Sequence, residues 1–178
     1  MLSPCTGKST IFGLVVFLCI ALCLPGEAQS EDRQTRHLFR IERSKNDNIV
    51  QYDVQVRTDG TLDPKEPVVA YWIRLAENGQ KQSLKWLEKK FAYGFRARYD
   101  AKTNSATLDM VAKIRRTIKV HEMQGEYRAE TAVEGRPAYL EKIYISSKGK
   151  GLSTEVVSIE LFGEDKQTGE ERYEKIDP

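Results

Sequence analysis

The chain has few of the side chains on which thiol and metal chemistry depend. All three of its cysteines lie within the first 23 positions, so residues 29–178 contain none. That part of the chain can form no disulfide, no thiolate metal site and no cysteine nucleophile. The two histidines, His37 and His121, are far apart in sequence and stand in no metal-ligand spacing. We therefore expect neither a bound metal ion nor another cofactor.

The chain also lacks a dominant charge of one sign and the short motifs of common enzymes. Its 28 Lys and Arg residues nearly balance its 26 Asp and Glu residues, which leaves a formal net charge of +2. Such a small charge creates no strong field for nucleic acid, so we expect no nucleic-acid partner. The sequence contains no G-x-S-x-G elbow, no H-E-x-x-H pair and no phosphate-loop glycines. An enzyme is therefore not the favoured interpretation.

No apolar run is long enough to cross a bilayer. The longest, residues 11–24, has 14 residues, against the roughly 20 that a membrane-spanning helix needs. A lysine precedes it, and Gly26 and Ala28 place small residues three and one positions before a cleavage point. This pattern is typical of a signal peptide over residues 1–28. We expect cleavage after Ala28 or, alternatively, after Ser30, and an exported mature chain without a transmembrane span.

The rest of the chain has the patterning of one β-rich domain. Residues 29–36 are polar and aperiodic, which predicts a flexible N-terminal segment before a single domain over residues 37–178. Apolar and polar residues alternate from Val50 to Val56, as in a half-buried strand. The same reasoning predicts strands over residues 38–44, 50–56, 68–75, 95–99, 126–133, 138–147, 154–162 and 170–176, with a longer alternation over 106–120.

The alternation over residues 106–120 is unusually long. It contains no Gly, Pro or Asn and exceeds the length of most strands in globular domains. We expect one strand with a bend or bulge near residues 113–116, where it turns a corner of the barrel or passes between two sheets. With this strand counted once or divided in two, the domain has nine or ten strands.

One short helix is expected, over residues 83–91. Ser83 can cap it, and Leu84, Leu87 and Phe91 follow the helical spacing that predicts a buried face. Nearly all other connections have hairpin length. We therefore predict a mainly β fold, an antiparallel up-and-down meander that closes like a barrel, with a two-layer sandwich as the alternative.

Two stretches of the sequence resemble a known family. They are H-L-F-R-I-E-R-S-K-N-D-N at 37–48, and Y-W-I-R-L-A-E-N-G at 71–79 with its continuation L-K-W-L-E-K-K-F-A-Y-G-F at 84–95. Both are similar to an uncharacterised family of exported bacterial proteins that is classified as a domain of unknown function. The resemblance covers essentially the whole chain after residue 28. It implies a periplasmic or secreted location in the bacterial envelope, and it supplies no activity.

Arginines within apolar strands are the first candidate site. Arg74 shares the parity of Trp72, and Arg40 follows an apolar residue in the first strand. If these side chains face a cavity in the barrel, the guanidinium groups can bind the carboxylate or phosphate of a small amphiphilic ligand. The alternative is that each arginine pairs with a nearby acid, such as Glu42 or Glu77, on a solvated face.

Trp86 is the second candidate site. On the predicted helix it lies away from the apolar face, among lysines that include Lys85 and Lys89. An aromatic side chain flanked by lysines can meet an anionic surface, a glycan or a partner protein. The alternative is that Trp86 packs beneath the segment 93–95.

These observations lead to three hypotheses of function. The first is a non-catalytic module that binds a small amphiphilic or apolar ligand through Arg40, Trp72 and Arg74. The second is a module that binds an envelope protein or a glycan through Trp86 and its neighbouring lysines. The third, a hydrolase-type enzyme, requires acids to meet one of the two histidines in a cleft. An enclosed cavity favours the first, an exposed aromatic patch the second, and a cleft of titratable groups the third.

Overall fold

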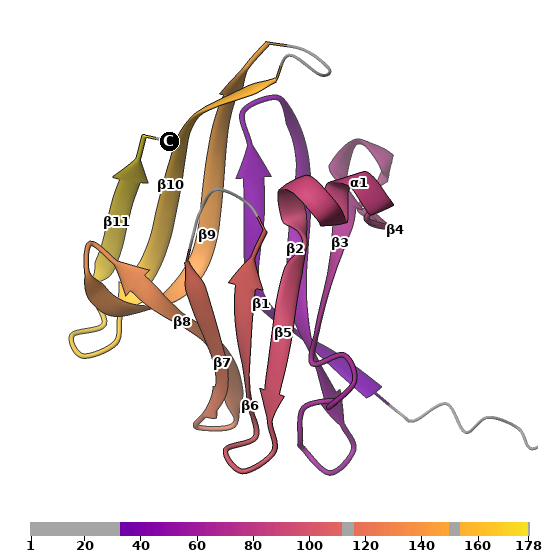
Figure 1. Ribbon diagram of the computed structural model, residues 1–178, viewed down its shortest axis with the longest axis vertical. Helices are drawn as coiled ribbons and strands as arrows, with labels where there is room; N and C mark the ends of the chain where they lie inside the picture. Colours follow the sequence, from indigo (N-terminus) through magenta and orange to yellow (C-terminus); the bar gives the residue numbers. More distant parts are fainter. Residues whose placement is uncertain (1–32, 112–115, 150–153, 178) are drawn as a thin grey trace, which may run out of the picture.

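The computed structural model describes residues 33–111, 116–149 and 154–177, and its fold is mainly β (Figure 1). Eleven strands form one curled sheet with the shape of a half-barrel. The strands are β1 (Arg33–Arg43), β2 (Asn46–Arg57), β3 (Val68–Arg74), β4 (Gln80–Ser83), β5 (Phe95–Asp100), β6 (Ser105–Met110), β7 (Thr117–Met123), β8 (Glu126–Val133), β9 (Arg136–Lys148), β10 (Glu155–Asp165) and β11 (Glu171–Ile176).

Strand β9 joins the two halves of the sheet. The hydrogen-bonded order runs β4-β3-β2-β1-β9-β8-β7-β6-β5, and β10 with β11 extends from the other edge of β9. The beginning of β9 pairs with β8, and its later part, residues 142–145, pairs with β1 in parallel. The two ends of the path curl toward each other, so that β5 and β6 pass in front of β1 and β2 (Figure 1).

The predicted barrel-like β fold is confirmed, and two of its details are corrected. The sheet is mixed and not a pure antiparallel meander, because β1 and β9 run parallel. The described residues form eleven strands and not nine or ten, because the sequence pattern missed β4 and joined two strands into one. Periodicity reports which face of a strand is buried, whereas it carries no information on which strand lies next to it.

The long alternation over residues 106–120 is a hairpin and not one bent strand. β6 and β7 pair antiparallel, with Ala106 opposite Val120 and Leu108 opposite Ile118. All four side chains are buried, so one parity points inward on both sides of the turn. This preserved parity made two strands look like one. The corner expected near residues 113–116 falls largely outside the described residues, since 112–115 are not among them.

The N-terminal boundary also differs from the expectation. Strand β1 begins at Arg33, so residues 33–36 belong to the sheet and not to a flexible segment. The predicted signal peptide over 1–28 and its two cleavage points lie outside the described residues. Within the described residues, no helix is long and apolar enough to cross a membrane.

The core fills the inside of the curl. The residues from Val50 to Val56 that the alternation predicted to be buried are indeed inside, with exposures of 0–2%. Tyr52 stacks on Phe39 of β1, with ring centroids 4.4 Å apart, and contacts Phe95 of β5 at 5.9 Å. These contacts connect the two ends of the sheet path across the interior, and the large side chains involved leave the half-barrel packed.

The helical region begins later than predicted. Residues 80–83 form β4, which pairs with β3, so Ser83 lies in a strand and caps no helix. A 3-10 turn, η1 (Leu75–Glu77), precedes β4, and α1 (Trp86–Glu88) continues into the π-helical turn η2 (Lys89–Tyr93). The backbone N–H of Lys85 donates to Glu88 Oε2 at 2.7 Å, which caps the start of α1.

Candidate functional site

The helical segment presents its large apolar side chains to solvent. Trp86, Leu87 and Phe91 are 67%, 60% and 66% exposed. Leu87 and Phe91 therefore do not form the buried face that the sequence predicted, and Trp86 does not pack beneath residues 93–95. The core contacts come instead from Leu84, which precedes the helix, and from Tyr93 at its end. We refer to Trp86, Leu87 and Phe91 together as the aromatic patch.

The π-helical turn brings the two rings of the aromatic patch together. In a regular α-helix of about 3.6 residues per turn, side chains five positions apart point about 140° away from each other. The wider turn of η2 places Phe91 beside Trp86 in an edge-to-face contact, with ring centroids 6.5 Å apart. Such π-turns occur often at functional sites. No local sequence pattern distinguishes this turn from an α-helix, so α-helical spacing predicts, wrongly, that Phe91 is buried.

Lysines surround the aromatic patch. Lys90 Nζ lies 4.8 Å from the ring centroid of Trp86 and 5.2 Å from that of Phe91, which is cation–π geometry. Lys85 and Lys89 are exposed on the same segment. Among the described residues, no acid forms an ion pair with any of these three lysines. Trp86, Lys85 and Lys89 thus lie on one exposed segment together with Leu87, Lys90 and Phe91. That this segment binds a partner stays a prediction.

A polar clamp holds the segment onto the sheet. Glu88 turns inward, and its Oε2 accepts a hydrogen bond from Trp72 Nε1 at 3.1 Å in addition to the bond from the Lys85 backbone. Arg43 of β1 lies 4.5 Å from the centroid of the Trp72 ring and donates to the Tyr93 hydroxyl at 2.8 Å. We call Arg43, Trp72, Glu88 and Tyr93 the clamp.

Burial keeps the tyrosines of this region protonated. Tyr52 donates from its hydroxyl to the backbone oxygen of Tyr93 at 2.6 Å, and burial raises the pKa of Tyr52 well above its ordinary value. Burial also raises the pKa of Tyr93, and the neighbouring Arg43 only partly opposes this effect. Both hydroxyls therefore stay neutral, and the end of the helical segment is fixed to strands β1 and β2.

Loss of Glu88 should loosen the clamp. A Glu88→Ala substitution leaves the buried Trp72 N–H without an acceptor and removes the cap of α1, which should lower the free energy of unfolding by about 1–2 kcal/mol. Denaturant unfolding followed by tryptophan fluorescence measures this loss. Glu77→Ala is the matched control, because it removes only the exposed ion pair with Arg74 and should cost little. Equal effects of the two substitutions would contradict the clamp.

Arg40, Trp72 and Arg74, the first candidate site, lie in two separate places. Trp72 and Arg74 line one shallow pocket of about 220 Å³ beside the clamp, where Trp72 is buried. Arg40 lies elsewhere, on the outer face of β1. Arg40 Nε pairs with Glu42 at 2.7 Å, and Arg74 Nη2 pairs with Glu77 at 2.6 Å, so each arginine has the acidic neighbour that the alternative interpretation named.

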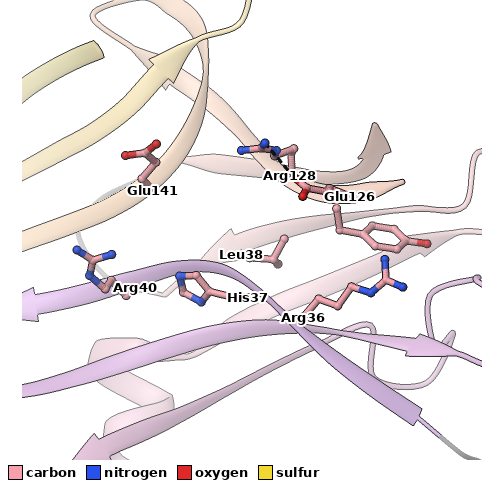
Figure 2. Close-up of a pocket in the computed structure, with 8 residues that line it drawn as sticks. Arg36, His37, Leu38, Arg40, Glu126, Arg128 and Glu141 are labelled. Atoms are coloured by element: carbon pink, nitrogen blue, oxygen red, sulfur yellow. Dashed lines mark hydrogen bonds and ion pairs between the residues drawn. The ribbon is translucent and has the colours of Figure 1, made fainter. Parts of the chain in front are cut away.

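Arg40 belongs to a groove between β1 and the strands β8 and β9 (Figure 2). The groove has a volume of about 470 Å³ and is lined by charged groups of both signs. Figure 2 shows Glu126 beside Arg128, to which it is bonded at 3.0 Å, while Glu141 and Arg40 lie at the other end. Of its three arginines, Arg40 and Arg128 already pair with Glu42 and Glu126, and Arg36 donates to the backbone oxygen of Gly125 at 2.9 Å.

A second groove follows the seam of the half-barrel, where β3 and β5 approach each other. It has a volume of about 510 Å³. Apolar side chains from both strands, among them Val68 and Phe95, line it together with Leu84. Three charged residues, Lys65, Glu66 and Lys89, also line it. We call this the seam groove. Sequence periodicity could not reveal it, because the groove depends on how the two ends of the sheet path meet.

A buried carboxylate ties the first three strands together on the outer face. Asp53 of β2 is 3% exposed. It accepts hydrogen bonds from Gln51 Nε2 at 2.8 Å and from the Tyr71 hydroxyl, and His37 Nδ1 lies 3.4 Å away. Burial raises the pKa of Asp53, but the hydrogen bonds from His37, Tyr71 and Gln51 outweigh it and leave the pKa below its ordinary value.

The two histidines belong to different clusters. His121 Nε2 lies 3.6 Å from Glu130 on β8, whereas His37 is on β1 beside Asp53. Residues 33–111, 116–149 and 154–177 contain no group of three or more acids and histidines placed to hold a metal ion.

The comparisons with known proteins concern the fold as a whole. The family described as a domain of unknown function (DUF4833) matches residues 39–175 of the chain. The protein belongs to this family. The match confirms the resemblance to a domain of unknown function that the motifs indicated. No curated protein and no solved structure matches the chain. DUF4833 membership assigns no activity, so the function has to be argued from the surface.

Proposed function

We propose that this DUF4833 protein is a non-catalytic interaction module and that the aromatic patch is its binding surface. The observation that carries the proposal is the exposure of Trp86, Leu87 and Phe91 on one short helical segment. Single exposed apolar side chains are common, whereas a contiguous group of this size usually marks an interaction site. Trp and Phe are also among the residues enriched at interfaces.

The clamp supports the same proposal. A helical segment that packed poorly by accident would have few specific contacts with the sheet. This segment is instead fixed through the side chains of Trp72, Glu88 and Tyr93. A surface held in one conformation loses little entropy when a partner binds, which favours affinity.

Export to the bacterial envelope is the second part of the proposal. It rests on the signal-peptide pattern of residues 1–28 and on the resemblance to exported proteins. The exported form, which begins after Ala28 or Ser30, retains the whole described domain.

A small amphiphilic ligand is the second candidate, and the seam groove is the place that favours it. The groove combines apolar walls around Val68, Leu84 and Phe95 with two lysines and one acid, Glu66, which accepts a hydrogen bond from Gln55 at 2.8 Å. This composition suits an acyl chain with an anionic end. The interior of the half-barrel is a less suitable place for such a ligand, because the core side chains fill it. Arg40 and Arg74 are also less suitable as its contacts, because each already pairs with an acid.

A recovery experiment tests the proposed binding surface. The tagged protein is produced in its own host and isolated without denaturation from the envelope fraction. The wild type, the double variant Trp86→Ala/Phe91→Ala and the control Val157→Ala are compared. Val157 is also exposed, at 48%, and lies on β10 outside the aromatic patch. We expect a bound component whose recovery falls about tenfold or more in the double variant and not in the control.

Two results would contradict the aromatic patch as the binding surface. One is that every bound component is recovered equally with all three proteins. The other is an added mass of small-molecule size in native mass spectra that persists in the double variant, which would favour the seam groove.

A further inference from the structure

We propose that the partner of the aromatic patch is an anionic lipid surface, on which the protein docks peripherally. This inference rests on the proposed function and names the chemistry of its partner. Trp86, Leu87 and Phe91 are the side-chain types that enter the boundary between headgroups and acyl chains. They project from one short segment, so they can enter such a boundary together without any change in the sheet.

The charges around the patch fit anionic headgroups. Residues 84–93 contain three lysines and one acid, Glu88. That acid points into the clamp, where its Oε2 binds Trp72 and the Lys85 backbone. The outward charge of the segment is therefore entirely positive. Lys90 lies over the Trp86 and Phe91 rings, and its stem can extend from the apolar region to the headgroups.

The size of the patch favours a lipid surface over a protein partner. Three side chains of at most about 250 Å² each, two-thirds exposed, offer about 500 Å² at most. One side of a standard protein interface buries about 800 Å². Lysine is depleted at protein interfaces, yet here one lysine covers the centre of the patch and two more flank it. A bilayer needs neither a large matching area nor a complementary shape.

Vesicle sedimentation tests this inference. The probes are large vesicles of equal parts phosphatidylglycerol and phosphatidylcholine, and vesicles of phosphatidylcholine alone. The protein is the form isolated from its own host. Because wild type and variants share the same N-terminus, only the patch differs between them. The variants are Trp86→Ala/Phe91→Ala and Lys85→Gln/Lys89→Gln, with Lys102→Gln/Lys175→Gln as the charge control on distant exposed lysines.

We expect binding to the anionic vesicles and much weaker binding to phosphatidylcholine. The partition coefficient should fall about fivefold for each lysine removed near the surface, about 25-fold for Lys85→Gln/Lys89→Gln, and should change little in the control. It should also weaken in high salt. Loss of both rings in Trp86→Ala/Phe91→Ala should abolish sedimentation with the vesicles.

Tryptophan fluorescence gives an independent reading. The chain has two tryptophans, and Trp72 is 5% exposed whereas Trp86 is 67% exposed. A shift of the emission to shorter wavelength on addition of anionic vesicles should therefore come from Trp86. The shift should be absent in a Trp86→Phe variant that still sediments with the vesicles.

The outcomes separate this inference from the proposed function. Vesicle binding that is absent, or that persists in Trp86→Ala/Phe91→Ala, overturns the lipid inference. If a protein or glycan is then recovered from the envelope in a manner that depends on the patch, the proposed function stands with a different partner. If nothing depends on the patch in either experiment, both proposals fail.

Discussion

Replacing Gly94 with alanine should destabilise the protein by about 3 kcal/mol or prevent it from folding. Gly94 ends the π-helical turn, and a Cβ at this position would lie 1.8 Å from the backbone oxygen of Lys89 and 2.7 Å from its carbonyl carbon. Both contacts are with backbone, so no side-chain rotation relieves them. The turn from Lys89 to Gly94 would have to open, which would displace Tyr93 of the clamp and disturb the aromatic patch.

Denaturant unfolding of Gly94→Ala measures this effect, and Gly135→Ala is its control. Gly135 lies in the β8–β9 turn with φ +73 and nothing within 4 Å of an added Cβ. Its substitution should cost only about 1 kcal/mol, for the left-handed backbone. If Gly94→Ala lowered the free energy of unfolding less than Gly135→Ala, the close approach of Gly94 to Lys89 would be contradicted. If Gly94→Ala folds, its binding in the recovery experiment should also be impaired.

The substitution Asp53→Asn should lower the free energy of unfolding by about 2–3 kcal/mol at pH 7. Asparagine preserves the volume but loses the negative charge that holds the Tyr71 hydroxyl, the Gln51 amide and His37. Its amide N–H₂ replaces one of the two carboxylate oxygens, so at least one of the present donors would lose its acceptor. Because the three partners lie on strands β1, β2 and β3, the loss should weaken the first hairpin and its neighbour together.

The effect of Asp53→Asn on the free energy of unfolding should depend on pH, and its direction can be stated. The pKa of Asp53 in the folded protein lies below its ordinary value of 3.8. The carboxylate therefore contributes its full stabilisation above about pH 5, and this contribution is lost as the pH falls through 3.8 toward the folded pKa. The difference in stability between wild type and Asp53→Asn should shrink over that range.

Urea unfolding at several pH values measures the difference for Asp53→Asn. Asp59→Asn serves as the control, because Asp59 is an exposed turn residue whose pKa is also lowered, in its case by hydrogen bonds from Thr61. A difference for Asp53→Asn that stayed constant from pH 7 to pH 2.5 would contradict the role of the charge.

Much of the fold could be predicted from the sequence because burial follows parity. The alternation in β2 identified its inner face, and Val50, Val54 and Val56 are buried as expected. The errors arose where two arrangements give the same pattern. Ala106 to Val120 keeps one parity through a hairpin, so one strand and two strands look alike. The short β4 carries four exposed polar residues and has no apolar alternation at all.

The candidate site was only partly predictable for a similar reason. Trp86, Lys85 and Lys89 can be proposed from the sequence, because an aromatic side chain flanked by lysines can meet an anionic surface, a glycan or a partner protein. The sequence predicts that Leu87 and Phe91 are buried, because their spacing from Leu84 suits an α-helix. No local pattern predicts the π-turn that changes this spacing. The Asp53 cluster and the seam groove depend on which strands are neighbours, and no local pattern contains that information.

The parallel pairing of β1 with β9 has a consequence for the order of folding. Ser44, at the end of β1, bonds to Ser147, 103 positions later in the chain. One edge of the N-terminal strand β1 therefore has no hydrogen-bond partner until almost the whole domain has been synthesised. Contacts of such long range carry a large loop-closure cost before they stabilise anything, and chains that depend on them fold in milliseconds to seconds, not microseconds. The hairpins between consecutive strands can form earlier, but the two halves of the sheet join only when β9 pairs with β1.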